Sequence, residues 1–146
     1  MNALNNHPLI RKYIDLNQFG RLLGMEFTII EPGSIEYNMP VTDDLLATPN
    51  AAHGGSLAAL LDATVGVGAL SAVCSDNMVV STIEMKTTFF GPAMKGDELV
   101  AHSFLMRKGK RIIFMEATVH NQRNELVAKA SATLNTYPME KAGYGA

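Results

Sequence analysis

The sequence is poor in the residues that build disulfides and metal clusters. Its 146 residues include one cysteine, Cys74, and no tryptophan. A single cysteine excludes a disulfide within the chain and leaves no cluster of thiolate ligands. The spacing of His7, His102 and His120 relative to carboxylates matches no metal site. We therefore expect neither a metal nor a redox cofactor.

An excess of charge of one sign is also lacking. Lysine and arginine together number 12, and aspartate and glutamate 14, which leaves a formal net charge of −2. This balance gives no bulk attraction to nucleic acid, so no nucleic-acid partner is expected. The first eight residues lack a positively charged start followed by an apolar run. No signal peptide is apparent, and a cytoplasmic location is expected.

Low-complexity tracts and internal repeats are absent from the sequence. Hydrophobic residues make up 47% of the chain, which is typical of an ordered globular protein of this length. The composition predicts a single domain over residues 1–146. Within it we expect a helical cover at residues 1–20 and a loose tail at residues 138–146.

One long hydrophobic run stands out at residues 53–73, where Asp62 is the only charged side chain. A helix that is apolar on every side is typically a buried one. The run is long enough to span a membrane, but a central aspartate would cost about 2.5–3.5 kcal/mol there. A core helix is therefore favoured over a membrane span. A buried lone carboxylate is costly unless it is paired or protonated, which makes function one explanation for Asp62.

Alternating segments surround this helix. Residues 23–31 and 34–41 read as two strands joined by a Pro-Gly turn, and four further strand-like runs follow the helix without a helix between them. The last run, residues 125–136, places alanines on one face, which lets a helix lie close to the sheet. The four later runs are predicted at residues 78–90, 98–107, 111–121 and 125–136. In the first of them the alternation predicts one face with Val79, Ser81, Ile83, Met85 and Phe89, and an opposite face with Thr82, Glu84 and Lys86.

These elements predict an α+β fold in which one curved antiparallel sheet wraps around a long central helix. Short turns between the four later strands favour antiparallel neighbours. A single sheet covers one side of a helix and leaves the other side open. A homodimer with two-fold symmetry would cover that side.

The start of the central helix has the features of an anion or carbonyl site. Gly54 and Gly55 occupy the position where backbone N–H groups are unpaired and the helix dipole is positive. Glycine lets a substrate approach this backbone closely, so the site can polarise a carbonyl oxygen. Asp62 lies about 12–14 Å further along the same helix, which is too far to act on that carbonyl. If both groups serve one substrate, the aspartate belongs to a neighbouring subunit.

The pattern His53-Gly54-Gly55, six residues and Asp62, followed by four strands, resembles the hotdog-fold acyl-CoA thioesterases. The resemblance is strongest to the PaaI-type branch, named after phenylacetic acid degradation, and covers roughly residues 24–137. It implies hydrolysis of a small acyl or aryl thioester, with coenzyme A entering as part of the substrate. It also implies a homodimer or a dimer of dimers.

The resemblance implies roles for individual residues. Asp62 would be the general base or the nucleophile, and the N–H of Gly54 would polarise the thioester carbonyl. His53 would shape the loop and the carbonyl site. Ser81 or Thr82 loosely matches a hydroxyl that assists in many relatives. Structural alternatives remain for each: a buried hydrogen bond for Asp62, a loop anchor for His53 and tight helix packing for Gly54.

One departure from the family pattern concerns the loop before the helix. Many relatives carry an asparagine six positions before the histidine, where this chain has Ala47. Either Asn50 takes over this contact through a different path of the loop, or the contact is absent. With Gly55, Asn50 is a candidate for substrate binding.

A basic turn follows at residues 107–111. Arg107, Lys110 and Arg111 either form a solvated hairpin or meet the phosphates of coenzyme A. The alternative function is a non-catalytic acyl-CoA binding or sensing domain. A hydratase of acyl thioesters is less well supported, since it needs an acid and a histidine arranged as a pair.

Overall fold

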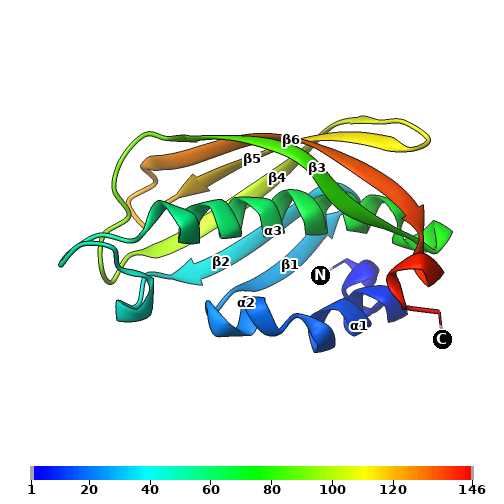
Figure 1. Ribbon diagram of the computed structural model, residues 1–146, viewed down its shortest axis with the longest axis horizontal. Coiled ribbons are helices and arrows are strands. Elements are labelled where there is room, and N and C mark those ends of the chain that lie inside the picture. Colours follow the sequence, from blue (N-terminus) through cyan, green and yellow to red (C-terminus); the bar gives the residue numbers. More distant parts are fainter. Residues whose placement is uncertain (1, 146) are drawn as a thin grey trace.

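The computed structural model describes residues 2–145. Two strands precede one long helix and four strands follow it, as expected for a sheet that wraps around that helix (Figure 1). The helices are α1 (Pro8–Leu16), α2 (Gln18–Leu22) and α3 (Gly54–Val73), and the strands are β1 (Glu26–Glu31), β2 (Ser34–Pro40), β3 (Met78–Phe89), β4 (Glu98–Lys108), β5 (Ile112–His120) and β6 (Leu126–Pro138). Short 3-10 turns are η1 (Ala3–Asn6), η2 (Asp43–Leu45), η3 (Cys74–Asp76) and η4 (Met139–Ala142).

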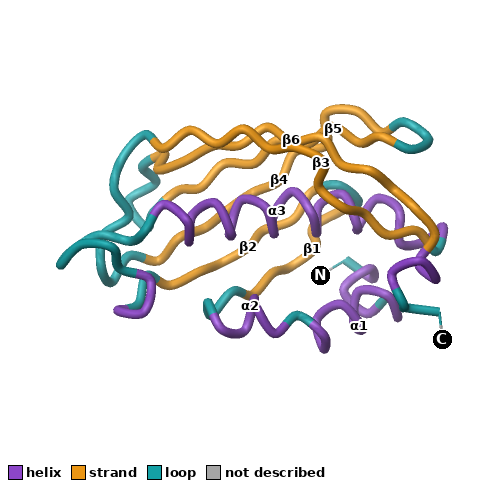
Figure 2. Tube along the Cα trace, viewed as in Figure 1, coloured by secondary structure: helices purple, strands orange, loops and turns teal. Residues whose placement is uncertain are grey.

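The six strands form one antiparallel sheet in the order β1-β2-β4-β5-β6-β3. The sheet curves along the length of α3, which lies against its concave side (Figure 2). This arrangement confirms the predicted α+β architecture and is the hotdog fold. Strand β3 stands last in this order and pairs with β6, so it forms one edge of the sheet, and β1 forms the other.

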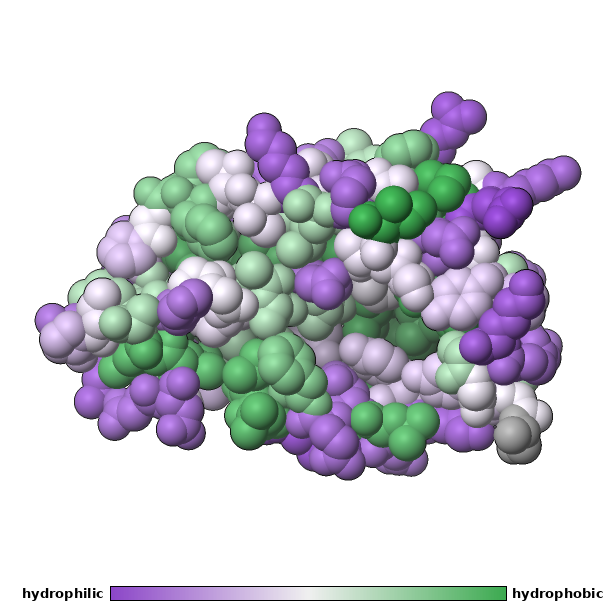
Figure 3. All heavy atoms as spheres, viewed as in Figure 1, coloured by the Kyte–Doolittle hydropathy of each residue, from purple (hydrophilic) through white to green (hydrophobic). Residues whose placement is uncertain are grey.

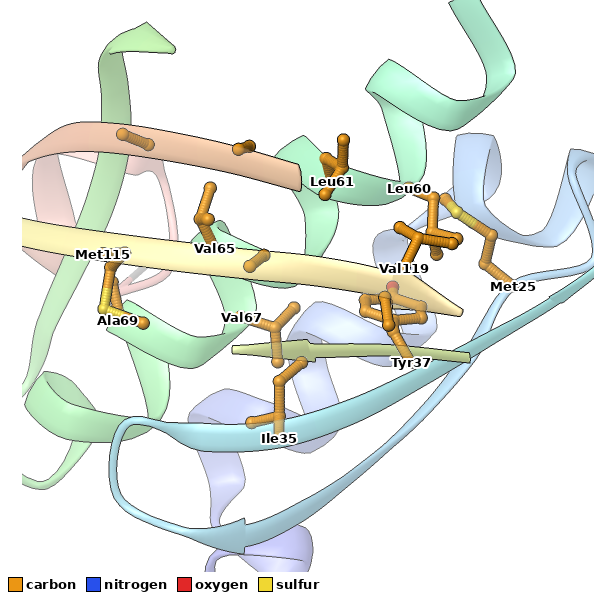
Figure 4. Close-up of a cluster of buried hydrophobic side chains, with 14 of the residues drawn as sticks. Met25, Ile35, Tyr37, Leu60, Leu61, Val65, Val67, Ala69, Met115 and Val119 are labelled. Atoms are coloured by element: carbon orange, nitrogen blue, oxygen red, sulfur yellow. The ribbon is translucent and has the colours of Figure 1, made fainter. Parts of the chain in front are cut away.

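The N-terminal part of helix α3 packs on the sheet through one side, whereas residues 67–71 near its end are all buried. Its buried face includes Leu60, Leu61, Val65 and Val67, and these side chains meet residues from β2 and β5 in the core (Figure 4). The helix is apolar and long enough to cross a membrane, but 67% of its most apolar window is buried inside this domain. Its role here is that of a core helix.

The alanines of β6 make this close packing possible, as the sequence predicts. Ala128, Ala130 and Ala132 are all buried on the face toward α3. On the helix, a side chain at Gly68 would lie 2.6 Å from the hydroxyl of Ser103. Small residues on both surfaces therefore set the distance between helix and sheet.

The opposite face of α3 is uncovered, which corrects the expectation that the helix is buried on all sides. Asp62 is exposed, Ala59, Ala63 and Gly66 are half-buried, and a side chain at Gly66 would meet nothing within 4 Å. In the space-filling view, small and apolar residues occupy most of the middle of this face, and strongly hydrophilic ones gather along its margins (Figure 3). An uncovered apolar stretch of this kind typically marks an interaction surface.

A β-bulge in β3 changes which residues face the helix. The pairing with β6 passes from Thr82–Leu134 to Glu84–Thr133, so Ile83 has no partner on β6. The extra residue reverses the alternation, and both Thr82 and Met85 pair with buried residues of the inner face of β6. The predicted alternation for this strand is therefore wrong before the bulge: Ser81 belongs to the outer face and Thr82 to the inner one.

Both chain ends differ from the predicted outline. The N-terminal helical segment is broken at Asn17, whose side chain accepts a hydrogen bond from the N–H of Gly20 at 3.1 Å and caps α2. At the other end, β6 continues to Pro138 and η4 follows it in place of a loose tail. The carbonyl of Tyr144 accepts a hydrogen bond from Nζ of Lys12 at 2.9 Å, which joins the two ends of the described chain.

Candidate active site

His53 caps the start of α3. Its Nδ1 accepts the N–H of Gly55 at 2.7 Å, and its backbone N–H donates to the carbonyl of Leu45 at 2.7 Å. This geometry requires an unprotonated Nδ1. The ring folds back so closely that a side chain at Gly55 would lie 2.8 Å from Nδ1. Gly55 thus serves the cap, and its N–H is not available to a substrate.

Gly54 has the free N–H that the sequence assigns to it. It is the first residue of α3, and within residues 2–145 its N–H finds no acceptor. A side chain there would lie 3.5 Å from the ring of Phe89, an ordinary contact distance. Packing inside the chain therefore does not require glycine at this position. What remains is a backbone donor at the positive end of a 20-residue helix.

Asp62 is held by the strand opposite it. The hydroxyl of Thr82 donates to Oδ1 of Asp62 at 2.7 Å, and both side chains are exposed in the single chain. The hydroxyl of Ser81 instead shares a hydrogen bond of 2.8 Å with the hydroxyl of Tyr137. The sequence left open whether Ser81 or Thr82 supplies the assisting hydroxyl, and the structure places the hydroxyl of Thr82 in contact with the carboxylate.

Asp62 and the residues on either side of Gly54 line different hollows of one chain. Asp62 lines a cleft of about 440 Å³, which we name the tyrosine cleft. Its walls are Tyr13, Asp62, Ala63, Gly66, Leu70, Val79, Val80, Thr82, Tyr137, Ala142 and Tyr144. His53 and Gly55 line a second hollow of about 330 Å³ beside α2 and η2. The two halves of the predicted site are therefore not combined within one chain.

The start of α3 is supported by a loop around Asp97, a residue that the sequence analysis did not single out. Asp97 is 4% exposed, and its carboxylate accepts the N–H of Met94 and the side-chain amide of Gln122, both at 2.9 Å. Next to Met94, the carbonyl of Ala93 accepts the N–H of Ala52 at 2.8 Å. Asp97 thereby fixes the loop against which the residues preceding His53 are hydrogen-bonded.

Asp97 also has a perturbed pKa. Burial raises the pKa of its carboxyl, but hydrogen bonds from Gln122 and Met94 and the charge of Arg123 together lower it below its usual value. The folded state therefore favours the charged carboxylate.

The other predicted binding residues lie at the two ends of α3. Asn50 is exposed in the loop before the helix, and its carbonyl accepts the N–H of Lys95 at 2.7 Å. Beyond the end of α3, the end of β4 and the turn that follows it carry Arg107, Lys110 and Arg111, all exposed. Lys108, the last residue of β4, donates to the carbonyl of Ala72 at 2.9 Å and so fixes this hairpin to the helix C-terminus.

The described residues offer no metal site, since no three His, Cys, Asp or Glu side chains of residues 2–145 come together. Cys74 is buried, and burial raises the pKa of its thiol. A buried thiol with a raised pKa is a poor nucleophile. Cys74 is therefore not a candidate nucleophile, whereas Asp62 lines the tyrosine cleft.

Comparison with known proteins agrees with this geometry. The medium/long-chain acyl-CoA thioesterase YigI of Escherichia coli K12 is 25% identical over 130 residues, covering 79% of this chain and 83% of its own. Human acyl-coenzyme A thioesterase 13 is 23% identical over 129 residues, covering 86% and 89%. The structure of E. coli PaaI, from the phenylacetic acid degradation operon, superposes with a TM-score of 0.79 at 21% identity, covering 87% and 89%.

The family assignment rests on the segment that contains the site. The sequence model of the thioesterase superfamily matches residues 50–128, more than half of the chain, and these include α3 with His53, Gly54 and Asp62. The chain therefore belongs to the thioesterase superfamily, and it is a thioester hydrolase with the hotdog fold.

Proposed function

We propose that the protein hydrolyses acyl-CoA thioesters, with Asp62 of one subunit and the N–H of Gly54 of a second subunit acting on the same substrate. The observation that carries the proposal is the pair of half-sites: a carboxylate held by Thr82 in a cleft, and a free helix N-terminal N–H elsewhere. Acyl-CoA is supported as the substrate class by the names of the relatives.

The second subunit is supported by two uncovered surfaces. Strand β3 is an edge strand of 12 residues, and Ile83, Phe89 and Phe90 next to its free edge are each about half exposed. Long apolar edges favour pairing with another chain. The uncovered face of α3 carries small residues that let two such helices lie close. Pairing of β3 with its copy in a homodimer would continue the sheet and bring the two helices together.

In this arrangement the chemistry divides between the two half-sites. The Gly54 N–H would donate to the thioester carbonyl oxygen and stabilise the negative charge that develops on it. Asp62 would either take a proton from a water molecule as that water attacks the carbonyl carbon, or attack the carbon itself and form an anhydride that water then hydrolyses. Thr82 would orient the carboxylate in both cases. The thiolate of coenzyme A leaves, and its phosphates would lie outside the cleft, where Arg107, Lys110 and Arg111 supply positive charge.

The first experiment replaces Asp62 with asparagine, which keeps the shape and removes the charge. We expect D62N to remain folded and to lose at least a hundredfold in kcat toward a panel of acyl-CoAs. Folded D62N that hydrolyses the panel at the wild-type rate would contradict the proposal. If the wild type binds acyl-CoA tightly but does not hydrolyse it, the alternative of a non-catalytic acyl-CoA binding domain is favoured. Such a domain does not need Asp62 as a base.

A second experiment tests the subunit boundary. Proline is accepted at the first helical position and lacks an N–H, and the extended backbone of His53 (ψ 135°) suits a residue before proline. We expect G54P to lose about a hundredfold in kcat, and G54A, which keeps the N–H, to lose less. Two inactive variants, D62N and G54P, are then unfolded together, refolded and assayed.

The mixture discriminates between the two arrangements. If the site spans two subunits, each mixed dimer contains one intact site, and an equimolar mixture recovers about a quarter of wild-type activity under two-fold symmetry. If both residues act within one chain, every site in the mixture is damaged and no activity returns.

A further inference from the structure

The tyrosine cleft is closed by both ends of the chain. Tyr13 comes from α1, Tyr137 from the end of strand β6, and Tyr144 from the segment after η4. All three lie outside residues 50–128, the part matched by the superfamily. Asp62 and Thr82, within that part, form the reactive side of the same cleft. The family core thus supplies the acid, and the terminal segments supply the opposite wall.

The terminal wall is held in place by specific contacts. The carbonyl of Tyr144 accepts a hydrogen bond from Lys12 at 2.9 Å, and its N–H donates to the carbonyl of Met139 at 3.2 Å. The N–H of Met139 in turn donates to the carbonyl of Asn77, at the start of β3, at 3.0 Å. The C-terminal segment is therefore fixed to α1 on one side and to the sheet on the other.

The charges of the cleft show which half of a thioester it suits. Its walls include no lysine, arginine or histidine, and Asp62 is their only charged side chain. The cleft walls offer no cation to a phosphate. The lysines of the basic turn, Lys108 and Lys110, line a separate hollow beside the cleft, which also includes Met78 and Thr136. A cleft of about 440 Å³ is also within the usual range for a small ligand. Uncharged groups fit it better than the nucleotide end of coenzyme A.

The hydroxyls of the cleft differ in their availability. Tyr137 shares its hydroxyl with Ser81, and the Thr82 hydroxyl is bound to Asp62. The hydrogen bonds that Tyr144 makes within residues 2–145 use its backbone N–H and carbonyl. The hydroxyl of Tyr144 is therefore available to form a hydrogen bond with a ligand. Burial raises the pKa of Tyr144, so the phenol stays protonated at neutral pH and can donate as well as accept.

We propose that the tyrosine cleft receives the acyl half of the thioester and that Tyr144 is its specificity-determining residue. The cleft would favour a neutral acyl group with a hydrogen-bonding substituent at its far end. It would disfavour an acyl group ending in a carboxylate, because Asp62 would repel it and the cleft walls carry no cation. The ammonium of Lys12, outside these walls, already donates to the carbonyl of Tyr144. This inference rests on the proposed acyl-CoA hydrolysis and adds the structural basis of acyl selection.

The test compares three substrates of equal chain length: hexanoyl-CoA, 6-hydroxyhexanoyl-CoA and adipoyl-CoA. We expect the wild type to prefer the hydroxylated substrate and to hydrolyse adipoyl-CoA least, as judged by kcat/KM. In Y144F, which keeps the ring, the preference for 6-hydroxyhexanoyl-CoA over hexanoyl-CoA should fall about fivefold, the usual effect of one lost hydrogen bond. Y144A, which opens the wall, should also raise the relative rate with longer saturated chains.

Two controls separate specificity from structural damage. Thr118→Val removes a hydroxyl from β5, away from the cleft, and should leave the substrate preference unchanged. Inhibition by free coenzyme A should be equal in wild type and Y144F, because the nucleotide binds outside the cleft.

Failure of this inference is distinct from failure of the proposed function. A wild type that is active but whose substrate preference is the same in Y144F and Y144A would overturn the role of Tyr144. Inactivity of the wild type toward all three substrates and the wider acyl-CoA panel would overturn the hydrolysis itself and the acyl assignment with it.

Discussion

The hydroxyl of Thr82 and the carboxylate of Asp62 are joined by a hydrogen bond of 2.7 Å between β3 and α3. The bond engages one of the two carboxylate oxygens and sets the direction of the other. It exists because the bulge at Ile83 turns Thr82 toward the helix. Without the extra residue, the register that holds from Glu84 onward would place Ile83 opposite Leu134, in the position that Thr82 occupies.

We predict that Thr82→Val lowers kcat about tenfold, because valine keeps the shape but leaves the Asp62 carboxylate without its donor. Thr82→Ser keeps the hydroxyl and should retain most of the activity. The measurement is steady-state hydrolysis of an acyl-CoA by variants shown to be folded. Ser81→Ala is the matched control, since Ser81 bonds Tyr137 rather than Asp62. Equal losses in T82V and S81A would argue against a specific role for Thr82.

A second prediction separates capping from chemistry at His53. His53→Ala removes the acceptor for the Gly55 N–H and should lower the free energy of unfolding by about 1 kcal/mol. Asparagine is among the best N-cap residues, so His53→Asn should restore stability and keep most of the activity. Urea unfolding and the hydrolysis rate are measured on both. If H53N is stable but as inactive as D62N, the imidazole takes part in the reaction.

The regular parts of the fold follow from local patterns in the sequence. The bounds of α3 agree with the long apolar run, and the turns at Pro32-Gly33 and Lys108-Gly109-Lys110 separate the strands where predicted. These features depend on neighbouring residues, so a single sequence contains the information. The small alanines of β6 indicate close helix packing for the same reason.

Other features depend on contacts between distant residues and could not be predicted in this way. Nothing in the sequence of β3 marks Ile83 as bulged, because the bulge arises from its register with β6. Apart from Asp62, the uncovered face of α3 differs from its buried face in the size of its residues and not in their polarity, so the sequence predicted burial on all sides. Asp97 is missed because its partners, Met94 and Gln122, come together only when two loops meet.

A third prediction uses two glycines of α3 that face opposite ways. Gly68→Ala should lower the free energy of unfolding by about 1–3 kcal/mol, because its new methyl would lie 2.6 Å from the Ser103 hydroxyl. That hydroxyl cannot easily move, since it accepts the N–H of Ile35 and donates to the carbonyl of Gly33. Gly66→Ala meets nothing within 4 Å of its own chain and should gain about 0.5–1 kcal/mol in helix propensity.

Urea unfolding reports the effect of both substitutions on stability. Sedimentation over a range of concentrations reports whether Gly66→Ala weakens association, which is expected if this face meets a second subunit. Destabilisation by G66A in a chain that stays monomeric at every concentration would contradict the open environment of Gly66.

The last prediction concerns Asp97 and pH. Because its pKa is lowered in the folded state, its stabilising effect is complete above about pH 4, the usual value for an unfolded aspartate. The effect is lost as the pH falls through the lowered value. Asp97→Asn should lower the free energy of unfolding by about 1–3 kcal/mol at pH 7, because asparagine cannot accept both hydrogen bonds as a carboxylate does. The difference from wild type should narrow at pH 3.

The matched control is Asp43→Asn. Asp43 forms an exposed ion pair with Lys95 at 2.9 Å, and exposed pairs of this kind contribute at most about 1 kcal/mol. Urea unfolding at pH 7 and pH 3 gives the required free energies for both variants. A difference between D97N and wild type that stays constant over this range would show that the charge of Asp97 does not stabilise the fold. Because Asp97 fixes the loop that positions His53 and Gly54, D97N should also lower kcat/KM at pH 7, and D43N should not.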